Sequence, residues 1–226
     1  MSNDSDFKLY GFWRTSSTYR VRVALRLKGL TAAEQIVDLE KGEQLSNSFL
    51  AINPLGAVPA LVLKGQAPLT QSLAILEFLD EKVPEPPLLP TDLLGRARVR
   101  SIASMLACDV HPLVTPRMRK YLTSTGGFDP SLWRAWQIHW FTEGLSAVET
   151  RLTSDPETGR FCHGDDPTLA DVCLASIVEI MHAFDIKTEA TPTIDRIMDN
   201  CRTVDAFVLA DPFRQSGAPV KSDSAE

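Results

Sequence analysis

The stretch 53–79 constrains the fold of this chain more than any other part of the sequence. Within it, a short apolar strand at 60–63 follows the dipeptide Val58-Pro59, and a glycine-containing turn leads to a second short strand. Because proline has no N–H to donate to a strand ladder, Pro59 belongs at the start or the edge of a strand. The Val58-Pro59 bond can also be cis, which presents the backbone of Val58 to a ligand instead of a neighbouring strand.

A helix begins directly after this hairpin, at Gln71-Ser72, and its apolar positions continue to Leu79. The start of a helix offers free backbone N–H groups and the positive end of the helix dipole. Because an amide and a hydroxyl add to these donors, Gln71 and Ser72 have the chemistry of a small anion-binding site. Taken alone, Ser72 is also compatible with an ordinary helix cap after a turn.

Up to residue 82 the chain alternates strand patterns with helical ones in the order β-α-β-α-β-β-α. This order predicts an α/β domain over 7–82, in which one sheet contains a parallel pair of strands and a hairpin. The predicted strands are 7–12, 34–38, 60–63 and a short edge ending at Leu69; the predicted helices are 19–28, a short one leading to Ala51 and one that opens at 70–72.

A proline-rich linker is predicted at 83–92, and only helical patterns follow it. We therefore expect an all-helical domain at 93–215 and a disordered tail at 216–226, where apolar residues are scarce. Thr168 and Asp171 form a capping box, so Asp171 is expected to be structural. The predicted helices are 95–110, 130–152, one from the capping box to Phe184, 192–200 and 204–209. Pro112 and Pro116 are expected to kink or restart the first of these helices.

Composition narrows the classes of function. The net charge is −6 without a basic stripe, which argues against a nucleic-acid partner. No apolar run is long enough to span a membrane, and the polar, acidic start differs from a signal peptide, so we expect a cytoplasmic protein. No metal site is predicted, because the four cysteines lack CxxC or zinc-binding spacing and are expected to be reduced: Cys108, Cys162, Cys173 and Cys201.

Several motifs in order resemble one family. Val-Pro and Gln-Ser at these positions resemble the thioredoxin-like domain of the glutathione transferases, and the loop 13–22 resembles the signature of their zeta class, the maleylacetoacetate and maleylpyruvate isomerases. Asn53-Pro54, the segment 109–112 and the capping box continue the resemblance over almost the whole chain. It implies a thioredoxin-like N-terminal domain, an all-helical C-terminal domain and a homodimer.

The resemblance also implies glutathione as cofactor. In this family the backbone at Val58-Pro59 pairs with the cysteinyl part of glutathione, while Gln71 and Ser72 hold its γ-glutamyl carboxylate. A thiol has a pKa near roughly 8.5 and must be shifted down to be a thiolate at neutral pH. A hydroxyl that donates to sulfur at a helix N-terminus lowers this pKa, through its hydrogen bond and the helix dipole together.

Within the signature loop we expect Ser16 to stabilise the thiolate, with Thr15 and Ser17 in support. Ser17 stands where the family often has a cysteine, so the resemblance predicts no active-site cysteine here. Arg14, beside the serines, is the first candidate to bind a substrate carboxylate or a developing enolate. His111 and Arg117 in the helical domain are the next candidates for substrate binding.

One departure from the family pattern concerns the end of the buried helix. The family usually has an arginine there for the distal carboxylate of the substrate, whereas this chain has Glu179-Ile-Met-His182-Ala183. His182 would replace that arginine only in part, because imidazole is mostly neutral at neutral pH.

Three functions remain open. The first is a glutathione-dependent cis–trans isomerase of a maleyl diacid in aromatic catabolism, in which the thiolate adds to the cis double bond, rotation follows, and elimination releases the trans isomer. The second is a general glutathione transferase that conjugates electrophiles or reduces peroxides. The third is a non-enzymatic binding module on the same fold, against which the intact site motifs argue.

Overall fold

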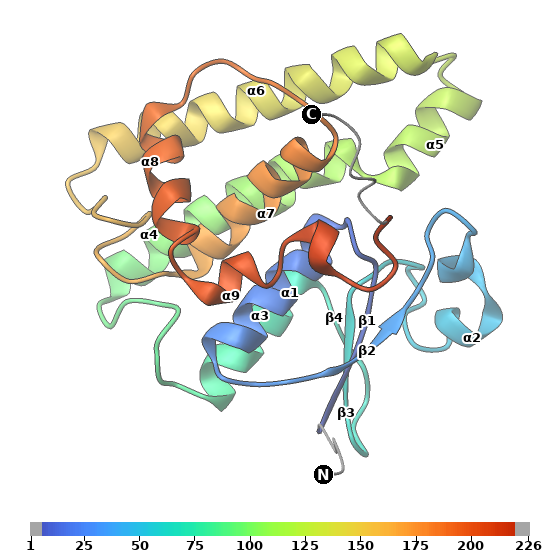
Figure 1. Cartoon of the computed structure of the whole chain (residues 1–226), viewed down its shortest axis with the longest axis horizontal. Coiled ribbons are helices and arrows are strands. Elements are labelled where there is room, and N and C mark those ends of the chain that lie inside the picture. Colours follow the sequence, from blue (N-terminus) through green and yellow to red (C-terminus); the bar gives the residue numbers. More distant parts are fainter. Residues whose placement is uncertain (1–5, 220–226) are drawn as a thin grey trace, which may run out of the picture. The chain divides into compact units, whose positions relative to one another are not determined.

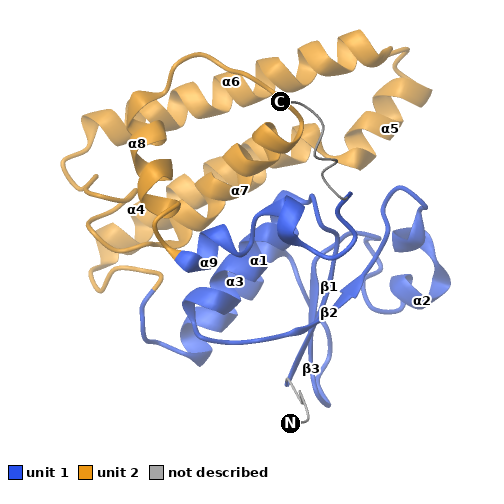
Figure 2. Cartoon of the chain, viewed as in Figure 1, with its two compact units in different colours: residues 1–87, 205–226 blue, residues 88–204 orange. Residues whose placement is uncertain are grey.

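The computed structural model describes residues 6–219, which form two compact units (Figure 2). The first unit runs to Pro87 and takes up the chain again from Asp205, and the second comprises Leu88–Val204. The first and last described residues, Asp6 and Pro219, thus belong to the same unit. Among the described residues, no helix is both long enough and apolar enough to cross a membrane.

The first unit contains a four-stranded sheet with the strand order β2-β1-β3-β4 (Figure 1). Strand β1 pairs in parallel with β2 and antiparallel with β3, which pairs antiparallel with β4. The predicted parallel pair and the predicted hairpin are therefore confirmed. The strands are β1 (Phe7–Gly11), β2 (Ala33–Ile36), β3 (Ala60–Leu63) and β4 (Leu69–Thr70).

Two long helices of this unit, α1 (Ser16–Leu27) and α3 (Ser72–Lys82), contact each other. Helix α1 begins three residues before the predicted start at Tyr19, and the Tyr19 N–H donates to the carbonyl of Thr15 at 2.9 Å. Its first turn is Ser-Ser-Thr, so the apolar periodicity that signals a helix becomes visible only later. The short elements between β2 and β3 are the 3₁₀ turn η1 (Glu43–Leu45) and α2 (Asn47–Leu50).

The predicted end of the helical domain at 215 differs from the structure. Helix α9 (Asp205–Val208) and the 3₁₀ turn η4 (Pro212–Arg214) belong to the first unit, where α9 contacts α1. Phe213 lies against Trp13, with ring centroids 5.5 Å apart. Helical periodicity reports that a short helix is amphipathic, but it does not report which domain covers its apolar face.

The predicted disordered tail at 216–226 is also corrected in part. Residues 216–219 are described, and Ala218 is partly buried against the cluster of apolar side chains that includes Trp13. Gly217, at φ +86°, lies close to Ile36 and Trp13. These few apolar contacts, which composition alone does not reveal, hold the segment on the first unit; residues 220–226 lie outside the described part of the chain.

The second unit is helical throughout its regular structure. The predicted helix 95–110 is divided: α4 ends at Ser104, and a π-helical segment, η2, continues to Val110. A Cβ placed on Gly144 would lie 2.2 Å from Val110 Cγ2, so glycine allows α6 to approach η2. The elements of this unit are α4 (Leu93–Ser104), η2 (Met105–Val110), the 3₁₀ turn η3 (His111–Val114), α5 (Pro116–Ser124), α6 (Pro130–Ser154), α7 (Leu169–Ala183) and α8 (Pro192–Cys201).

The capping box at the start of α7 is buried as well as formed. Asp171 is fully buried, and its two carboxylate oxygens accept the N–H groups of Cys162 (2.7 Å) and Thr168 (2.8 Å) and the Thr168 hydroxyl (2.8 Å). Burial raises the pKa of Asp171, and these hydrogen bonds act in the opposite direction. The carboxylate thereby ties the segment before α7 to the first turn of the helix.

The predicted linker at 83–92 is an ordered connection in its second half. Leu88 and Leu89 are buried, and the Leu88 carbonyl accepts the N–H of Leu169 at 2.9 Å. On the side of the first unit, the buried Lys28 ammonium binds Asp80 (2.6 Å) and the carbonyl of Pro86. The predicted linker therefore contributes ordered residues to each unit, Pro86 to the first and Leu88 and Leu89 to the second.

Candidate functional site

The first turn of α1 is open to an anion. Thr15 is the N-cap residue in an extended conformation, its side chain makes no capping hydrogen bond, and the turn carries no acidic residue. The N–H groups of Ser16, Ser17 and Thr18 donate to no acceptor within the described residues. Three donors and the positive end of the helix dipole therefore converge at this point.

The hydroxyl groups of this turn differ in what they bind. Ser17 donates to the carbonyl of Val58 at 3.0 Å, and Thr15 donates to the Thr18 hydroxyl at 2.5 Å. The side chain of Ser16 is only 2 % exposed, and its hydroxyl makes no hydrogen bond to any other described residue. Of the two serines, Ser16 is therefore the one whose hydroxyl is available to a ligand.

The turn before β3 brings the backbone of Val58 beside Ser17. The Val58-Pro59 bond is cis, as its position at a strand start permits. The buried Asn53 side chain holds the turn, since its amide donates to the carbonyl of Ala57 (2.6 Å) and its oxygen accepts the N–H of Leu55 (3.1 Å). Asn53 is thus a positioning residue for the Val58 backbone.

A second anion-binding geometry lies at the start of α3. Gln71, the N-cap residue, has φ +68°, a conformation that a residue with a side chain adopts at a cost of roughly 1–3 kcal/mol. Such strain is typical of binding sites. The hydroxyl of Ser72 accepts a hydrogen bond from Arg20 Nη1 at 3.2 Å, and Arg20 is almost fully buried. A cation therefore lies directly behind the helix start.

Arg20 was missed among the predicted site residues, although the sequence contains a signal for it. Arg20 and Arg22 both stand among the apolar residues of a helix that must be buried. Arg22 has a structural explanation, because it binds Glu34 of β2 and the carbonyl of Trp13 (3.2 Å). Arg20 instead donates to the Ser72 hydroxyl, so its charge lies at the candidate anion site.

Gln44 was also missed. Its side-chain oxygen is buried and accepts no hydrogen bond within the described residues. Its backbone lies close to the turn before Val58, since a Cβ placed on Gly56 would be 3.2 Å from the Gln44 carbonyl oxygen. A buried acceptor beside this turn can bind an N–H group of a ligand that lies along the Val58 backbone.

Arg14 projects from the loop between β1 and α1. Its guanidinium forms an ion pair with Glu40, and its Cζ lies 5.5 Å from the ring centre of Trp13 and 5.8 Å from that of Phe12. These rings belong to an apolar cluster that also contains Val58. One packed cluster therefore supports both the arginine and the turn at Val58.

His111 and Arg117 lie in the second unit. His111 is half-buried at the start of η3, and Arg117 is exposed near the start of α5. Arg117 makes no ion pair or hydrogen bond within the described part of the chain, and α5 also carries Arg119 and Lys120. This cationic helix suits a carboxylate, but the position of His111 and Arg117 opposite the serines stays a prediction.

The end of α7 carries an acid where a cation would suit a diacid. Glu179 lies 3.7 Å from both Arg202 and the exposed His182, and Ala183 is the last residue of the helix. No arginine of α7 is available here, as the sequence indicates.

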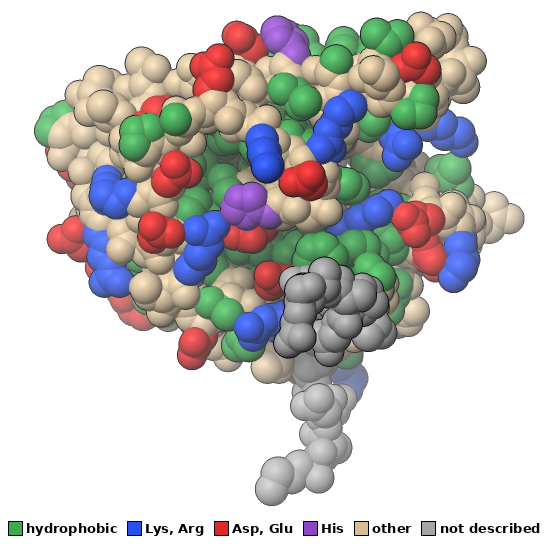
Figure 3. Space-filling view, turned by 45° about the horizontal axis from the view of Figure 1, so that its top comes forward, with side chains coloured by type: hydrophobic (Ala, Val, Ile, Leu, Met, Phe, Trp, Pro, Cys, Tyr) green, Lys and Arg blue, Asp and Glu red, His purple; other side chains and the backbone are tan. Residues whose placement is uncertain are grey.

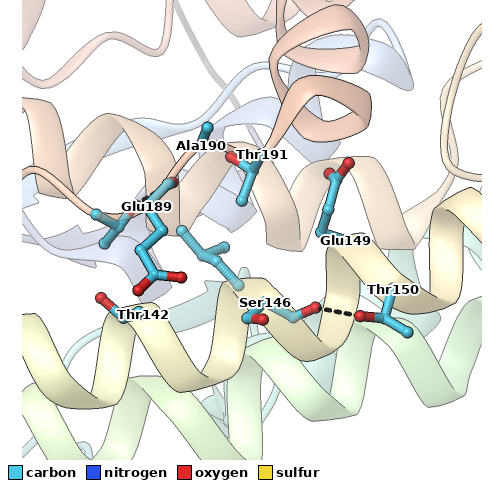
Figure 4. A pocket seen from close by; sticks show the side chains of 9 residues that line it. Thr142, Ser146, Glu149, Thr150, Glu189, Ala190 and Thr191 are labelled. Carbon is cyan, nitrogen blue, oxygen red and sulfur yellow. Dashed lines mark hydrogen bonds between the residues drawn. The ribbon is translucent and has the colours of Figure 1, made fainter.

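Two hollows in the surface lie away from these residues. The first unit has a groove of about 430 Å³ between β1 and α2, lined by Tyr10 and Phe49 among others. The second unit has a pocket of about 70 Å³ between α6 and the segment before α8 (Figure 4). In that pocket, burial would raise the pKa of Glu149, but the N–H groups of Thr193 and Ile194 lower it overall by donating to the carboxylate. Neither lining includes a predicted site residue.

The surface charge is mixed. On the face drawn in Figure 3, acidic and basic side chains are interspersed among apolar ones.

Known proteins are similar to this chain over most of its length. Residues 16–82 match the family described as glutathione S-transferase, N-terminal domain. A maleylpyruvate isomerase of Ralstonia sp. is 42 % identical over 208 residues, which cover 92 % of this chain and 98 % of that protein. A maleylacetoacetate isomerase from Methylobacterium extorquens AM1, crystallised with malonate and glutathione, is 46 % identical, with a TM-score of 0.92 and coverage of 94 % of this chain and 100 % of that one.

A second solved structure names the class. The holo form of a maleylpyruvate isomerase, described as a bacterial glutathione S-transferase of the zeta class, has a TM-score of 0.91 and 42 % identity, and the two chains are covered to 94 % and 100 %. The resemblance inferred from the motifs, and the thioredoxin-like and all-helical architecture that it implied, are thereby confirmed. This chain belongs to the zeta class of the glutathione transferases, the family of the maleylacetoacetate and maleylpyruvate isomerases.

Proposed function

We propose that this protein is a glutathione-dependent cis–trans isomerase that acts on a maleyl diacid, maleylacetoacetate or maleylpyruvate, in aromatic catabolism. The observation that carries the proposal is the hydroxyl of Ser16, which binds no other described residue and lies at an open helix N-terminus where the next residue, Ser17, contacts the backbone of Val58. Such a group can stabilise a thiolate, and the relatives described above are named as isomerases of maleylpyruvate and maleylacetoacetate.

The residues of the first unit fit glutathione. Its γ-glutamyl carboxylate suits the N-terminus of α3, where Gln71 and Ser72 offer polar groups and Arg20 supplies a buried positive charge. Its cysteinyl backbone suits the backbone of Val58, and its sulfur suits Ser16. Because Ser17 already donates to the Val58 carbonyl, we assign Ser17 a positioning role for this turn, and Thr15 one for the first turn of α1.

The chemistry follows from these assignments. Glutathione, when bound, supplies a thiolate that adds reversibly to the double bond and so permits rotation. The hydroxyl of Ser16 and the free N–H groups of α1 keep the thiol deprotonated at neutral pH by stabilising negative charge. The guanidinium of Arg14 holds a substrate carboxylate through paired hydrogen bonds and stabilises the negative charge that develops as the thiol adds. Arg117 and His111 are proposed to bind the distal carboxylate.

The experiment is an absorbance assay of maleylpyruvate with catalytic glutathione, run beside chlorodinitrobenzene conjugation. We expect isomerisation that requires glutathione without consuming it, and that falls sharply in Arg14→Ala. Retention on a glutathione-affinity column addresses the binding-module alternative, because a protein without a glutathione site would pass through. Conjugation without isomerisation would reject the proposal.

A general transferase is the second candidate, and the end of α7 favours it. Glu179 lies there with His182, and a diacid would meet a negative charge at that place if it extended to α7. The variant Ala183→Arg separates the two functions. Under the isomerase proposal, activity is present before the substitution and survives it; isomerisation that appears only in Ala183→Arg would favour the general transferase.

We further propose that the protein is a cytoplasmic homodimer. The support is the resemblance to transferases that form two-fold dimers, together with four free cysteines, which suit a reducing compartment. Sedimentation at micromolar concentration checks the assembly, and a species of monomer mass alone would contradict it.

A further inference from the structure

We infer that Glu40 is a specificity-determining residue, because its carboxylate competes with a substrate carboxylate for the guanidinium of Arg14. The inference rests on the proposed function, in which Arg14 binds the substrate. It concerns a residue that no motif of the sequence singles out.

The geometry around Arg14 makes this competition direct. Arg14 Nη2 contacts Glu40 Oε1, and the guanidinium lies near the faces of Phe12 and Trp13, which limits where it can move. A guanidinium recognises a carboxylate with a planar fork of N–H donors, so a donor that binds Glu40 is lost to a second carboxylate. A ligand carboxylate must therefore share Arg14 with Glu40 or displace it.

The turn that contains Glu40 is stabilised by hydrogen bonds that do not involve the Glu40 carboxylate. Asp38 Oδ1 accepts the backbone N–H groups of Glu40 (2.9 Å) and Lys41 (3.2 Å), and Asp38 pairs with the Lys41 ammonium at 2.9 Å. Glu43 accepts the N–H of Asp38 at 2.8 Å. Apart from Arg14, the Glu40 carboxylate binds no other described residue through a hydrogen bond or ion pair. Glu40→Gln should consequently leave the turn folded.

The exposure of the two side chains sets the size of the effect. The Arg14 side chain is 29 % exposed and that of Glu40 is 60 % exposed, so this is a surface ion pair. Pairs of this kind change an equilibrium by about two- to fivefold. The competitor is therefore weak enough for a dicarboxylate to displace. A neutral electrophile does not need Arg14 and is unaffected, so Glu40 selects among ligands by their charge.

The test compares Glu40→Gln with Glu81→Gln, an equal change of charge at an exposed site on α3 that has no ion pair within the described residues. In Glu40→Gln we expect KM for maleylpyruvate to fall about two- to fivefold, with kcat nearly unchanged. KM for chlorodinitrobenzene should stay the same. In the unmodified protein, salt weakens both the substrate's pairing with Arg14 and the competing Glu40 pair, and these two effects on KM partly cancel. In Glu40→Gln only the first effect remains, so KM for maleylpyruvate should rise more steeply with ionic strength.

Malonate titrated calorimetrically into the glutathione-saturated protein measures the same competition without turnover, and it should bind two- to fivefold more tightly to Glu40→Gln, by about the strength of a surface pair. The inference would be overturned if KM and malonate affinity in Glu40→Gln were unchanged or equal to those in Glu81→Gln. It would also be overturned if KM rose and malonate bound more weakly, which would mean that Glu40 aligns Arg14 for its ligand. If no variant isomerised maleylpyruvate, the proposed function would be rejected instead. The malonate affinities would still decide whether Glu40 competes for Arg14.

Discussion

Replacing Ser16 by alanine should raise the pKa of the bound glutathione thiol by roughly 1–2 units. The hydroxyl of Ser16 has no other partner among the described residues, so the hydrogen bond to sulfur is removed without breaking a second one. A hydrogen bond to a charged group contributes about 1.5–3 kcal/mol, and about 1.36 kcal/mol corresponds to one pKa unit. The sign follows because the thiolate, not the thiol, loses the stabilisation.

The open N-terminus of α1 remains in this variant. Its dipole and free N–H groups contribute about 0.3–1 kcal/mol to an anion, so the pKa should stay somewhat below that of a free thiol, near roughly 8.5. At neutral pH the thiolate fraction should fall by roughly five- to fifteenfold, and turnover should fall with it.

Ser17→Ala is the matched control, because it removes the same group one residue away. The Ser17 hydroxyl donates to the carbonyl of Val58 and is not available to sulfur in the same geometry. We expect a pKa shift of less than about half a unit, with a modest loss of glutathione affinity as the turn loosens, in keeping with a neutral hydrogen bond.

Thiolate absorbance followed against pH, with glutathione bound, measures the pKa in each protein directly. The pH at which turnover begins to rise provides an independent reading and should move upward in Ser16→Ala. If Ser17→Ala shifts the pKa more than Ser16→Ala does, the assignment of the two serines is reversed and the reasoning from their hydrogen bonds is wrong.

Three further predictions concern the other groups. Gln71→Ala and Ser72→Ala should each weaken glutathione binding by roughly 1.5–3 kcal/mol, and unchanged affinity in both by calorimetry would remove the anion site at α3. Arg14→Ala should lower kcat/KM for isomerisation by about ten- to a hundredfold and Arg117→Ala by less, as steady-state kinetics would measure; equal losses would give the two arginines equal weight. Asp171→Ala should lower the free energy of unfolding, measured in urea, by roughly 3–5 kcal/mol, because buried N–H and O–H donors lose a charged acceptor. A loss below about 1 kcal/mol would contradict the structural role of Asp171.

Local patterns in the sequence were sufficient for the architecture. Apolar alternation and helical periodicity depend on neighbouring residues, so they predicted the parallel pair, the hairpin and the helical second unit. The position of Pro59 and the polar start of α3 likewise placed the two candidate binding turns. The polar first turn of α1 carried no such periodicity, and its start was therefore predicted late.

Only the tertiary structure decided which polar groups are engaged and which are available. Ser16 and Ser17 are indistinguishable as neighbours in sequence, but the Ser17 hydroxyl donates to a carbonyl 41 residues away, whereas the Ser16 hydroxyl binds no other residue between 6 and 219. Arg20 becomes part of an anion site through a contact across 52 residues, and Arg14 acquires its competitor, Glu40, across 26. The return of residues 205–219 to the first unit likewise depends on contacts between segments that are distant in sequence. A hydrogen bond or ion pair is set by distance in space, and periodicity along the chain does not report where two distant segments meet.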